Sequence, residues 1–303
     1  MKLLLLGCGG QIGWELQRSL APLGELVALD HDSTGLKADF SRPEELADTV
    51  RKVRPQVIVN AAAHTAVDKA ESEPELARKI NATAPGVLAD AAREVGAWMV
   101  HYSTDYVFDG SGSRPWREED STGPLSVYGQ TKLEGEQLIA RNCKRHLIFR
   151  TSWVYAARGG NFAKTMLRLG SERDHLTVID DQFGAPTGAD LVADVTAHAI
   201  REVLQDAGKA GLYHLVAAGE TTWNGYARFV LEQARAAGVE LKASPDTVEA
   251  VPSSAFPTPA RRPHNSRLDT GKLQGAFGLT LPRWQTGVAR MLRETLFSGT
   301  TTP

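Results

Sequence analysis

The chain has 303 residues, of which 42% are hydrophobic and 23% charged, and its formal net charge is -2. These values suit one large α/β domain or a core domain with a smaller one, and they argue against a nucleic-acid partner because no basic run is present. The two cysteines, Cys8 and Cys143, cannot build a disulfide framework and have no metal-ligand spacing around them, which favours a reduced, cytoplasmic setting.

The first apolar run, Leu3–Leu6, is predicted as a buried strand. It is too short for a secretory signal, which needs roughly 7–15 apolar residues and a cleavage site. No stretch of the sequence approaches the roughly 20 apolar residues that span a bilayer. We therefore expect neither a signal peptide nor a membrane partner.

From the start to about residue 150, short apolar runs alternate with longer segments of helical periodicity. This alternation predicts right-handed βαβ units and an α/β fold with a Rossmann-type, doubly wound parallel sheet over residues 1–150. The predicted strands are Leu3–Leu6, Leu26–Leu29, Val57–Val59, Trp98–His101 and Leu147–Phe149, and the predicted helices are Trp14–Leu20, Pro43–Val53, Pro74–Val95 and Val127–Ala140.

The pattern is looser in the second half of the chain. Predicted strands are Thr177–Ile179 and Tyr213–Val216, and predicted helices are Asp190–Leu204, Thr222–Ala237 and Trp284–Leu296, with an irregular proline-rich segment at Pro252–Pro263. We expect residues 151–303 to form mostly a smaller substrate-binding lobe at the carboxyl edge of the sheet. Part of 185–216 is expected to return to the Rossmann domain.

A glycine-rich turn joins the first strand to the first helix. Gly7, Gly10 and Gly13 follow a G-x-x-G-x-x-G spacing, in which the first allows the tight turn, the second admits a pyrophosphate and the third lets the helix pack closely. The helix N-terminus offers free N–H groups to the anion. The turn therefore predicts a dinucleotide site, although a merely tight βα turn would carry the same glycines.

Asp30 ends the second predicted strand, where a carboxylate can accept hydrogen bonds from the adenosine ribose. The carboxylate would repel a 2′-phosphate. The next residues are His31 and Asp32, so no lysine or arginine lies beside it. NADH is therefore readily accommodated, although Asp30 could also be a surface acid. Asp39 and Phe40 could line the adenine pocket or belong to a helix N-cap region.

Tyr128 and Lys132 form a Y-x-x-x-K pair on one face of a predicted helix. An ammonium beside a phenol lowers the pKa of the tyrosine, which would make Tyr128 a general acid able to protonate a carbonyl oxygen. Taken alone, the spacing could be accidental. Thr104 lies just beyond the fourth strand, where a hydroxyl would point into the ligand crevice or simply cap the strand.

Longer strings carry a resemblance to a known family. The glycine loop, Asn60-Ala61-Ala62-Ala63, Ser103-Thr104 and Tyr128/Lys132 resemble the extended short-chain dehydrogenase/reductases. The closest similarity within that family is to the dTDP-4-dehydrorhamnose reductases, and it covers essentially the whole chain. It is carried by the stretches 64–71, 103–110, 150–155, 181–187 and 261–266.

This resemblance implies reduction of the C4 keto group of a dTDP-linked deoxysugar with NADPH or NADH. It places cofactor contacts at Gln11, Ile12, Asp30, Asp39, Phe40, Ala63, His64 and Thr65, and substrate contacts at Thr104, Asp105 and Trp153. Some members are associated with magnesium and with homodimers, but no metal-ligand cluster is readable in the sequence, so the metal site is unknown. Relatives usually have a residue other than glycine at the position of Gly9. The extra glycine should loosen the turn here without moving the key amides.

Two other functions remain open at this stage. A nucleotide-sugar epimerase or dehydratase shares the glycine loop and Y-x-x-x-K, but dehydratases typically have Asp-Glu after the threonine, and Tyr106 follows Asp105 here. A cofactor-binding regulatory subunit without turnover is the second alternative.

Trp153 is expected to pack on the sugar, with a hydrophobic plug between the lobes as the alternative.

Overall fold

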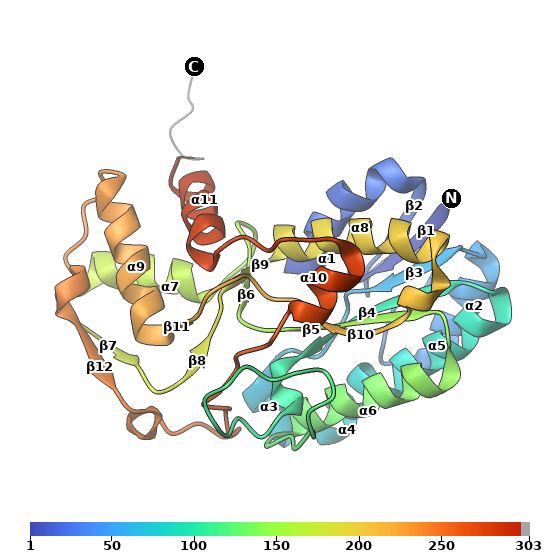
Figure 1. Ribbon diagram of the computed structural model, residues 1–303, viewed down its shortest axis with the longest axis horizontal. Coiled ribbons are helices and arrows are strands. Elements are labelled where there is room, and N and C mark those ends of the chain that lie inside the picture. Colours follow the sequence, from blue (N-terminus) through green and yellow to red (C-terminus); the bar gives the residue numbers. More distant parts are fainter. Residues whose placement is uncertain (298–303) are drawn as a thin grey trace.

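Six parallel strands form the central sheet of the computed structural model, which describes residues 1–297 (Figure 1). Their order across the sheet is β10-β5-β4-β3-β1-β2. The strands are β1 (Lys2–Leu6), β2 (Glu25–Leu29), β3 (Val57–Asn60), β4 (Trp98–Thr104), β5 (His146–Thr151) and β10 (Gly211–His214). Every neighbouring pair is parallel, so all carboxyl ends meet at one edge.

The sheet has its switch point at β1, which pairs with β2 on one side and with β3 on the other. Connections from neighbouring strands therefore leave toward opposite faces, and a crevice opens at the carboxyl edge between them. Helices cover both faces of the sheet, so its central strands are buried; β4, for example, is buried at all seven positions. The predicted Rossmann-type sheet is confirmed.

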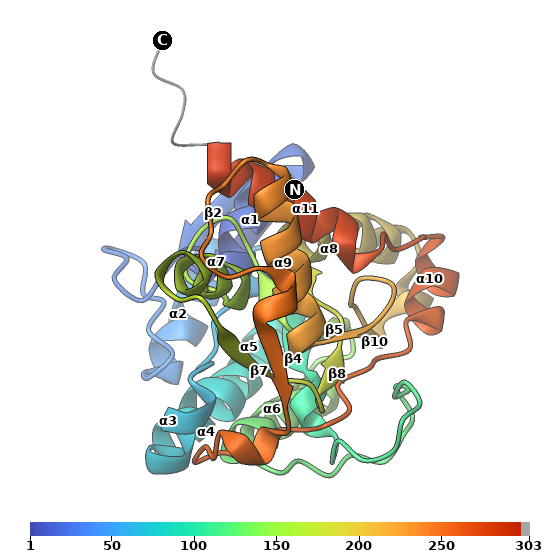
Figure 2. The same cartoon turned by 90° about the vertical axis from the view of Figure 1, so that its left-hand side faces the viewer.

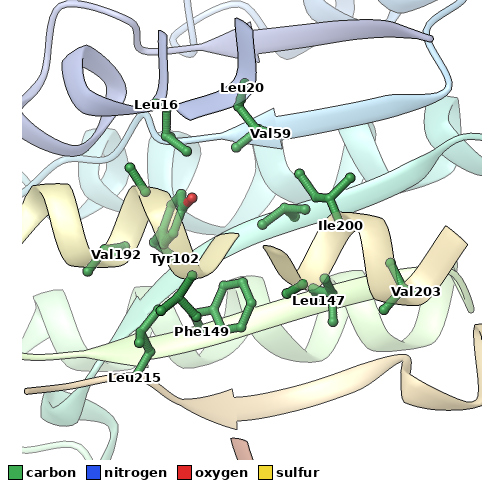
Figure 3. Close-up of a cluster of buried hydrophobic side chains, with 14 of the residues drawn as sticks. Leu16, Leu20, Val59, Tyr102, Leu147, Phe149, Val192, Ile200, Val203 and Leu215 are labelled. Atoms are coloured by element: carbon green, nitrogen blue, oxygen red, sulfur yellow. The ribbon is translucent and has the colours of Figure 1, made fainter. Parts of the chain in front are cut away.

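Helices α1 (Gln11–Leu20), α8 (Ala189–Gln205) and α10 (Gly271–Phe277) cover one face of the sheet, and α2 (Pro43–Val53), α5 (Ala84–Val95) and α6 (Val127–Asn142) cover the other. Figure 3 shows Val192, Ile200 and Val203 of α8 among Leu147 and Phe149 of the sheet. Helix α8 packs beside α1 although about 170 residues separate them. Arg18 and Ser19 of α1 both form hydrogen bonds with Asp194 of α8.

A second hydrophobic core lies beyond the carboxyl edge. It packs α7 (Phe162–Glu172), α9 (Trp223–Ala236) and α11 (Trp284–Phe297) with the parallel pair β7 (Leu176–Ile179) and β12 (Val248–Val251). Figure 2 views this lobe with α9 in front. Short pairs connect it to the sheet: β6 (Val154–Tyr155) with β9 (Thr187–Gly188), and β8 (Phe183–Gly184) with β11 (Thr221–Thr222).

The predicted elements are present, but some bounds differ and further elements occur that had not been predicted. Strand β4 continues to Thr104, three residues beyond the predicted end, and β10 ends at His214 rather than residue 216. The predicted helix Pro74–Val95 is divided into α4 (Pro74–Arg78), a π-helical turn at Lys79–Thr83 and α5. The elements α3 (Val67–Ser72), α7, α10 and β12 had not been predicted, and the last residues of the predicted lobe, 298–303, lie outside the described residues.

The proline-rich segment is irregular as predicted, apart from a short turn at Ser253–Ala255. It is anchored to α3 where Arg262 forms two hydrogen bonds with Asp68, at 3.1 and 2.7 Å. Within residues 1–297, the helices are all too short or too polar to span a bilayer.

A buried ion pair joins the sheet to α6. Arg150 of β5 donates to both carboxylate oxygens of Glu136, at 2.9 and 2.7 Å, and each side chain is 5% exposed. The Arg150 guanidinium also lies 4.9 Å from the ring centroid of Phe108. Because a buried charge without its partner is costly, this pair fixes how α6 sits on the sheet.

We expect Glu136→Ala to lower the free energy of unfolding by about 3–5 kcal/mol, since it leaves the Arg150 guanidinium buried and uncompensated. Chemical denaturation measures this loss. The matched control is Glu172→Ala, which removes an exposed i,i+4 pair with Arg168 and should cost about 0–1 kcal/mol. Equal losses in the two variants would contradict the structural role of the buried pair.

Candidate active site

The glycine loop sits at the carboxyl end of β1 and is held to the neighbouring strand. The backbone N–H groups of Gly7 and Cys8 both donate to the carbonyl of Leu29, at 2.9 and 3.2 Å. Gly7 has φ +81°, and a Cβ there would contact the backbone of Ala62. A Cβ on Gly13 would overlap the Gly7 carbonyl. The loop therefore needs glycine at both positions, and α1 begins directly behind it at Gln11.

Asp30 lies against this loop rather than in free solvent. Its carboxylate accepts hydrogen bonds from the N–H of Gly9 at 2.7 Å and from the N–H of His31 at 2.8 Å. Partial burial acts to raise the pKa of Asp30, but the hydrogen bonds from His31 and Gly9 outweigh it and the pKa is lowered. A Cβ on Gly9 would overlap the carboxylate. The extra glycine thus ties the turn to Asp30, where the sequence had suggested a looser turn.

One pocket of about 640 Å³ runs from the glycine loop across the carboxyl edge of the sheet to the second lobe. It is called the main pocket below. Most predicted site residues line it: Gly7, Gly10, Gln11, Ile12, Asp30, Asp39, Phe40, Ala63, Thr65, Thr104, Asp105, Tyr128, Lys132 and Trp153.

The main pocket also has polar atoms that no protein group satisfies. Oε1 of Gln11 and the hydroxyl oxygens of Ser103, Thr151 and Ser152 are buried without hydrogen-bond partners among the described residues, and all four residues line the pocket. Buried polar groups are normally paired, so these atoms await a polar ligand. Together with the glycine loop and the Asp30 carboxylate, they give the main pocket a size and polarity that fit a dinucleotide and a second polar molecule.

Two predicted contacts lie outside the pocket lining. Gly13 is buried behind the loop, where its role is close packing. The side chain of His64 is 9% exposed and its Nε2 lies 3.7 Å from a carboxylate oxygen of Glu73. The backbone of His64 is bonded on both sides to the Asn81 side chain, at 2.8 and 3.1 Å. The Asn81 side chain therefore supports the loop that carries Ala63 and Thr65.

Asn81 was not predicted from the sequence. It lies in the π-helical turn and also donates to the hydroxyl of Thr131 on α6, at 3.2 Å. A single amide therefore joins the loop after β3 to the helix that carries Tyr128. Single π turns often occur at functional sites. The helical periodicity of residues 74–95 predicted one continuous helix and gave no sign of this turn.

Tyr128 is positioned over the end of β4. Its ring meets the ring of Tyr106 edge to face, with centroids 5.5 Å apart. The Thr104 hydroxyl donates to Asp105 at 3.1 Å and accepts from the N–H of Tyr106 at 3.2 Å, which fixes it at the pocket. Burial raises the pKa of Tyr128 to about 12, although its hydrogen bond with Thr104 acts to lower it. The pKa is thus raised by burial where the sequence had suggested a lowering by Lys132, and Tyr128 holds its proton.

Lys132 is buried beneath Tyr128 on the same helix. Its Nζ donates to the carbonyl of Tyr102 at 2.6 Å and lies 3.2 Å from Nε2 of His101. Burial lowers the pKa of Lys132 to about 8, while the charge of Glu136 acts to raise it.

Burial raises the pKa of Asp105 to about 6, so this carboxyl titrates close to neutral pH.

Trp153 forms the wall of the pocket toward the second lobe. Its φ of +50° is unusual for a non-glycine residue and turns the indole away from the sheet. The ring stacks on Trp223 with centroids 3.7 Å apart and an interplanar angle of 16°. Nε1 of Trp223 donates to Gln182 at 3.1 Å. Both indoles line the main pocket, and Trp223 was not predicted from the sequence.

Among residues 1–297, no group of three or more histidine, cysteine, aspartate or glutamate side chains gathers in a way that could hold a metal ion. The magnesium implied by the sequence resemblance therefore finds no ligand set in this part of the chain.

Comparison with known proteins places this arrangement in a defined group. The family model described as the RmlD substrate binding domain matches residues 1–297. The dTDP-4-dehydrorhamnose reductase of Escherichia coli (strain K12) is 63% identical over 300 residues, which cover 99% of each chain. The enzyme of the same name from Burkholderia thailandensis is 48% identical, with 98% of this chain and 99% of that protein covered.

Solved structures of enzymes with the same name are also similar to this chain. A dTDP-4-dehydrorhamnose reductase from Clostridium acetobutylicum has a TM-score of 0.86 at 34% identity, with 96% of this chain and 98% of that chain covered. The dTDP-4-dehydrorhamnose reductase from Bacillus anthracis, solved in complex with NADP, has a TM-score of 0.85 at 32% identity and covers 97% of this chain and 99% of its own.

We expect Gly13→Ala to weaken NADH binding about ten- to hundredfold, because a displaced helix start loses charge-assisted hydrogen bonds worth about 1.5–3 kcal/mol. Fluorescence titration measures the dissociation constant. Gly275→Ala on α10, where a Cβ meets open space, is the matched control and should bind as the native protein does. Native affinity in Gly13→Ala would show that the close packing at this glycine is not required.

Proposed function

The chain belongs to the family of dTDP-4-dehydrorhamnose reductases, and from this premise we propose that it reduces the C4 keto group of dTDP-4-dehydro-β-L-rhamnose. The product is dTDP-β-L-rhamnose, and the reaction is the last step of dTDP-L-rhamnose synthesis. The observation that carries the proposal is the convergence of Tyr128 and Thr104 at one pocket with the glycine loop and Asp30.

The bound cofactor, NADPH or NADH, supplies the hydride. The chain would hold it with the N–H groups at the start of α1, because the amides of the glycine loop itself donate within the protein and a helix N-terminus with its dipole favours a pyrophosphate. Asp30 is placed for the adenosine ribose, and Asp39 and Phe40 line the same end of the main pocket. The cofactor contacts proposed at Ala63 and Thr65 lie on the loop that Asn81 holds.

Tyr128 is the proposed proton donor to the C4 oxygen. Its high pKa keeps the phenol protonated at neutral pH, so the acid is ready when a ketone enters. The Thr104 hydroxyl lies beside it and can bond the same carbonyl oxygen. Lys132, when charged, stabilises the phenolate that remains after proton transfer, because opposite charges attract strongly in a buried site.

The substrate is proposed to lie between β4 and the second lobe. Thr104 and Asp105 provide polar contacts from the end of β4, and the indole of Trp153 provides a flat surface for the C–H face of the hexose. Its stacking on Trp223 keeps this surface in one orientation, which helps to position the carbonyl for reaction.

We propose that the enzyme works in the cytoplasm and that it can form a homodimer.

A dehydratase reaction is less well supported by the residues after Thr104. Removal of water needs an added acid–base pair, and the position after Asp105 holds Tyr106, whose ring packs against Tyr128. The regulatory alternative is also disfavoured, since all three proposed catalytic side chains line the pocket.

Tyr128→Phe keeps the ring and removes the acidic proton. We expect turnover to fall by about 10²–10⁴-fold, the usual contribution of a positioned acid, with NADH binding little changed. Nicotinamide absorbance is followed with and without dTDP-4-dehydro-L-rhamnose. The control is Tyr213→Phe, which removes a hydroxyl bonded to the Lys209 carbonyl, away from the pocket. Near-native turnover in Tyr128→Phe would exclude this residue as the acid.

Asp30→Ala is expected to raise the ratio of kcat/KM for NADPH to that for NADH about tenfold, as removal of a repulsion of ~1.4 kcal/mol with a 2′-phosphate would do. Steady-state kinetics with both cofactors measures the ratio, and the native enzyme should use NADH at useful rates. Asp32→Ala removes a neighbouring exposed charge and serves as the control. A hundredfold preference of the native enzyme for NADPH would contradict this assignment of Asp30.

Trp153→Ala should raise KM or lower kcat about tenfold by removing a surface that orients the sugar, a loss of ~1.4 kcal/mol. The melting temperature should stay close to native, because the side chain is only partly buried. Trp116→Phe disturbs another stacked pair, outside the pocket, and should leave the kinetics unchanged. A strongly destabilised Trp153→Ala whose folded fraction has native kinetics would instead identify Trp153 as a plug between the lobes.

A further inference from the structure

His31 lies at the Asp30 end of the main pocket, and both residues line it. Nδ1 of His31 lies 3.1 Å from Oδ1 of Asp30, and the same oxygen accepts the backbone N–H of His31 at 2.8 Å. The rest of the imidazole is open to solvent, since 79% of the side chain is exposed. His31 has no part in the chemistry described above.

The Asp30 carboxylate is held in place for this contact. Its second oxygen, Oδ2, accepts the N–H of Gly9 at 2.7 Å, so one oxygen is bound to the glycine loop and the other to His31. The N–H of Asp30 donates to the Ser33 hydroxyl at 2.8 Å, and the N–H of Ser33 donates to the Asp30 carbonyl at 3.0 Å. This turn keeps the imidazole beside the carboxylate at the rim of the pocket.

The charge on His31 decides what the Asp30 end of the pocket can bind. A carboxylate here suits the ribose hydroxyls of NADH, whereas a 2′-phosphate requires a cation. An imidazolium provides one, because its Nδ1–H pairs with Asp30 and its Nε2–H remains as a donor to a phosphate oxygen. A neutral ring leaves the negative charge of Asp30 uncompensated.

Three carboxylates around His31 favour its charged form. Its hydrogen bond with Asp30 and the charge of that group, together with the charges of Asp32 and Asp39, raise the pKa of His31 above the ordinary value. Asp39 faces the ring from the segment before α2. Arg42 on that segment lies 4.0 Å from Asp39 and 3.2 Å from Glu45, so its charge is already paired.

The other titratable groups at this turn keep their charge near neutral pH. Burial raises the pKa of the Cys8 thiol on the glycine loop, so the thiol stays neutral. Arg158 of the second lobe, which faces that thiol, stays charged. Hydrogen bonds with Ser41 lower the pKa of Asp39, so that carboxylate stays ionised. The imidazole of His31 is therefore the group here that changes charge between about pH 6.5 and about pH 8.5.

We propose that His31 sets the cofactor preference of this enzyme: as an imidazolium paired with Asp30 it binds the 2′-phosphate of NADPH, and as a neutral ring it leaves Asp30 to the ribose hydroxyls of NADH. The inference rests on the proposed placement of the adenosine ribose at Asp30. Protonation of His31 and binding of the 2′-phosphate favour each other by the same factor, because the two equilibria are linked. Acidification therefore shifts the preference toward NADPH.

The first test measures the dissociation constants of NADH and NADPH by fluorescence titration at about pH 8.5 and about pH 6.5, where the 2′-phosphate, with a second pKa of about 6, keeps most of its charge. The ratio of the NADH constant to the NADPH constant should rise about five- to tenfold on acidification. His31→Gln should abolish this rise. His175→Gln, which removes an exposed histidine after Asp174 in the second lobe, should respond as the native protein does.

The second test observes His31 directly by NMR of protein with labelled histidine, with the signal assigned by its absence in His31→Gln. Saturation with NADPH should raise the titration midpoint of His31 by about 0.7–1 pH unit relative to saturation with NADH, which is the same coupling of five- to tenfold seen from the other side. His175 provides the internal control, and its midpoint should be the same with both cofactors.

A native ratio that does not change with pH, an equal change in His31→Gln, or equal His31 midpoints with the two cofactors would overturn the proposal. Because the native protein alone supplies the ratio and both midpoints, the proposal can be refuted whatever the variants do. Neither test needs turnover. Loss of reductase activity with these binding results intact would count against the proposed reduction and not against the role of His31.

Discussion

The hydrogen bond from Nζ of Lys132 to the carbonyl of Tyr102 ties α6 to the end of β4, and the site depends on this attachment. It sets the rotation of the helix about its axis, and therefore the direction of Tyr128 one turn away. The same strand continues into Thr104, so the phenol and the hydroxyl meet at one point of the carboxyl edge. A shift of α6 by one residue would separate them.

Several other buried polar contacts hold the same helix in place. Glu136 pairs with Arg150 of β5, and Thr131 accepts a hydrogen bond from Asn81 in the π-helical turn. Such contacts add little net stability compared with apolar packing, but they admit only one arrangement because each donor needs its acceptor. This protein places them on the buried side of α6, toward the sheet and toward the π-helical turn. The apolar core supplies most of the stability, while the polar contacts fix the geometry of the site.

The second lobe completes the pocket from the opposite side. Trp153 follows the sheet with a left-handed backbone and stacks on Trp223 of α9, which packs against the second hydrophobic core. The irregular proline-rich segment is fastened to α3 through Arg262 and Asp68. The pocket thus lies between two packed bodies, and its far wall is made of aromatic surface rather than of charged groups.

The sequence by itself determined the sheet, the phosphate loop and the Tyr128–Lys132 pair, because each rests on local spacing: apolar runs, glycines every third residue, and two side chains one helical turn apart. Only the tertiary structure decided which distant groups meet them. Nothing near His101 in the sequence reveals that Asn60 of β3 and Lys132 of α6 lie on either side of it, since these residues are 41 and 31 positions away. The bond between Gly9 and Asp30, the support of His64 by Asn81 and the stacking of Trp223 on Trp153 likewise join separate segments. The pKa of Tyr128 is raised rather than lowered as the spacing had suggested, because burial is a property of the folded chain and spacing cannot measure it.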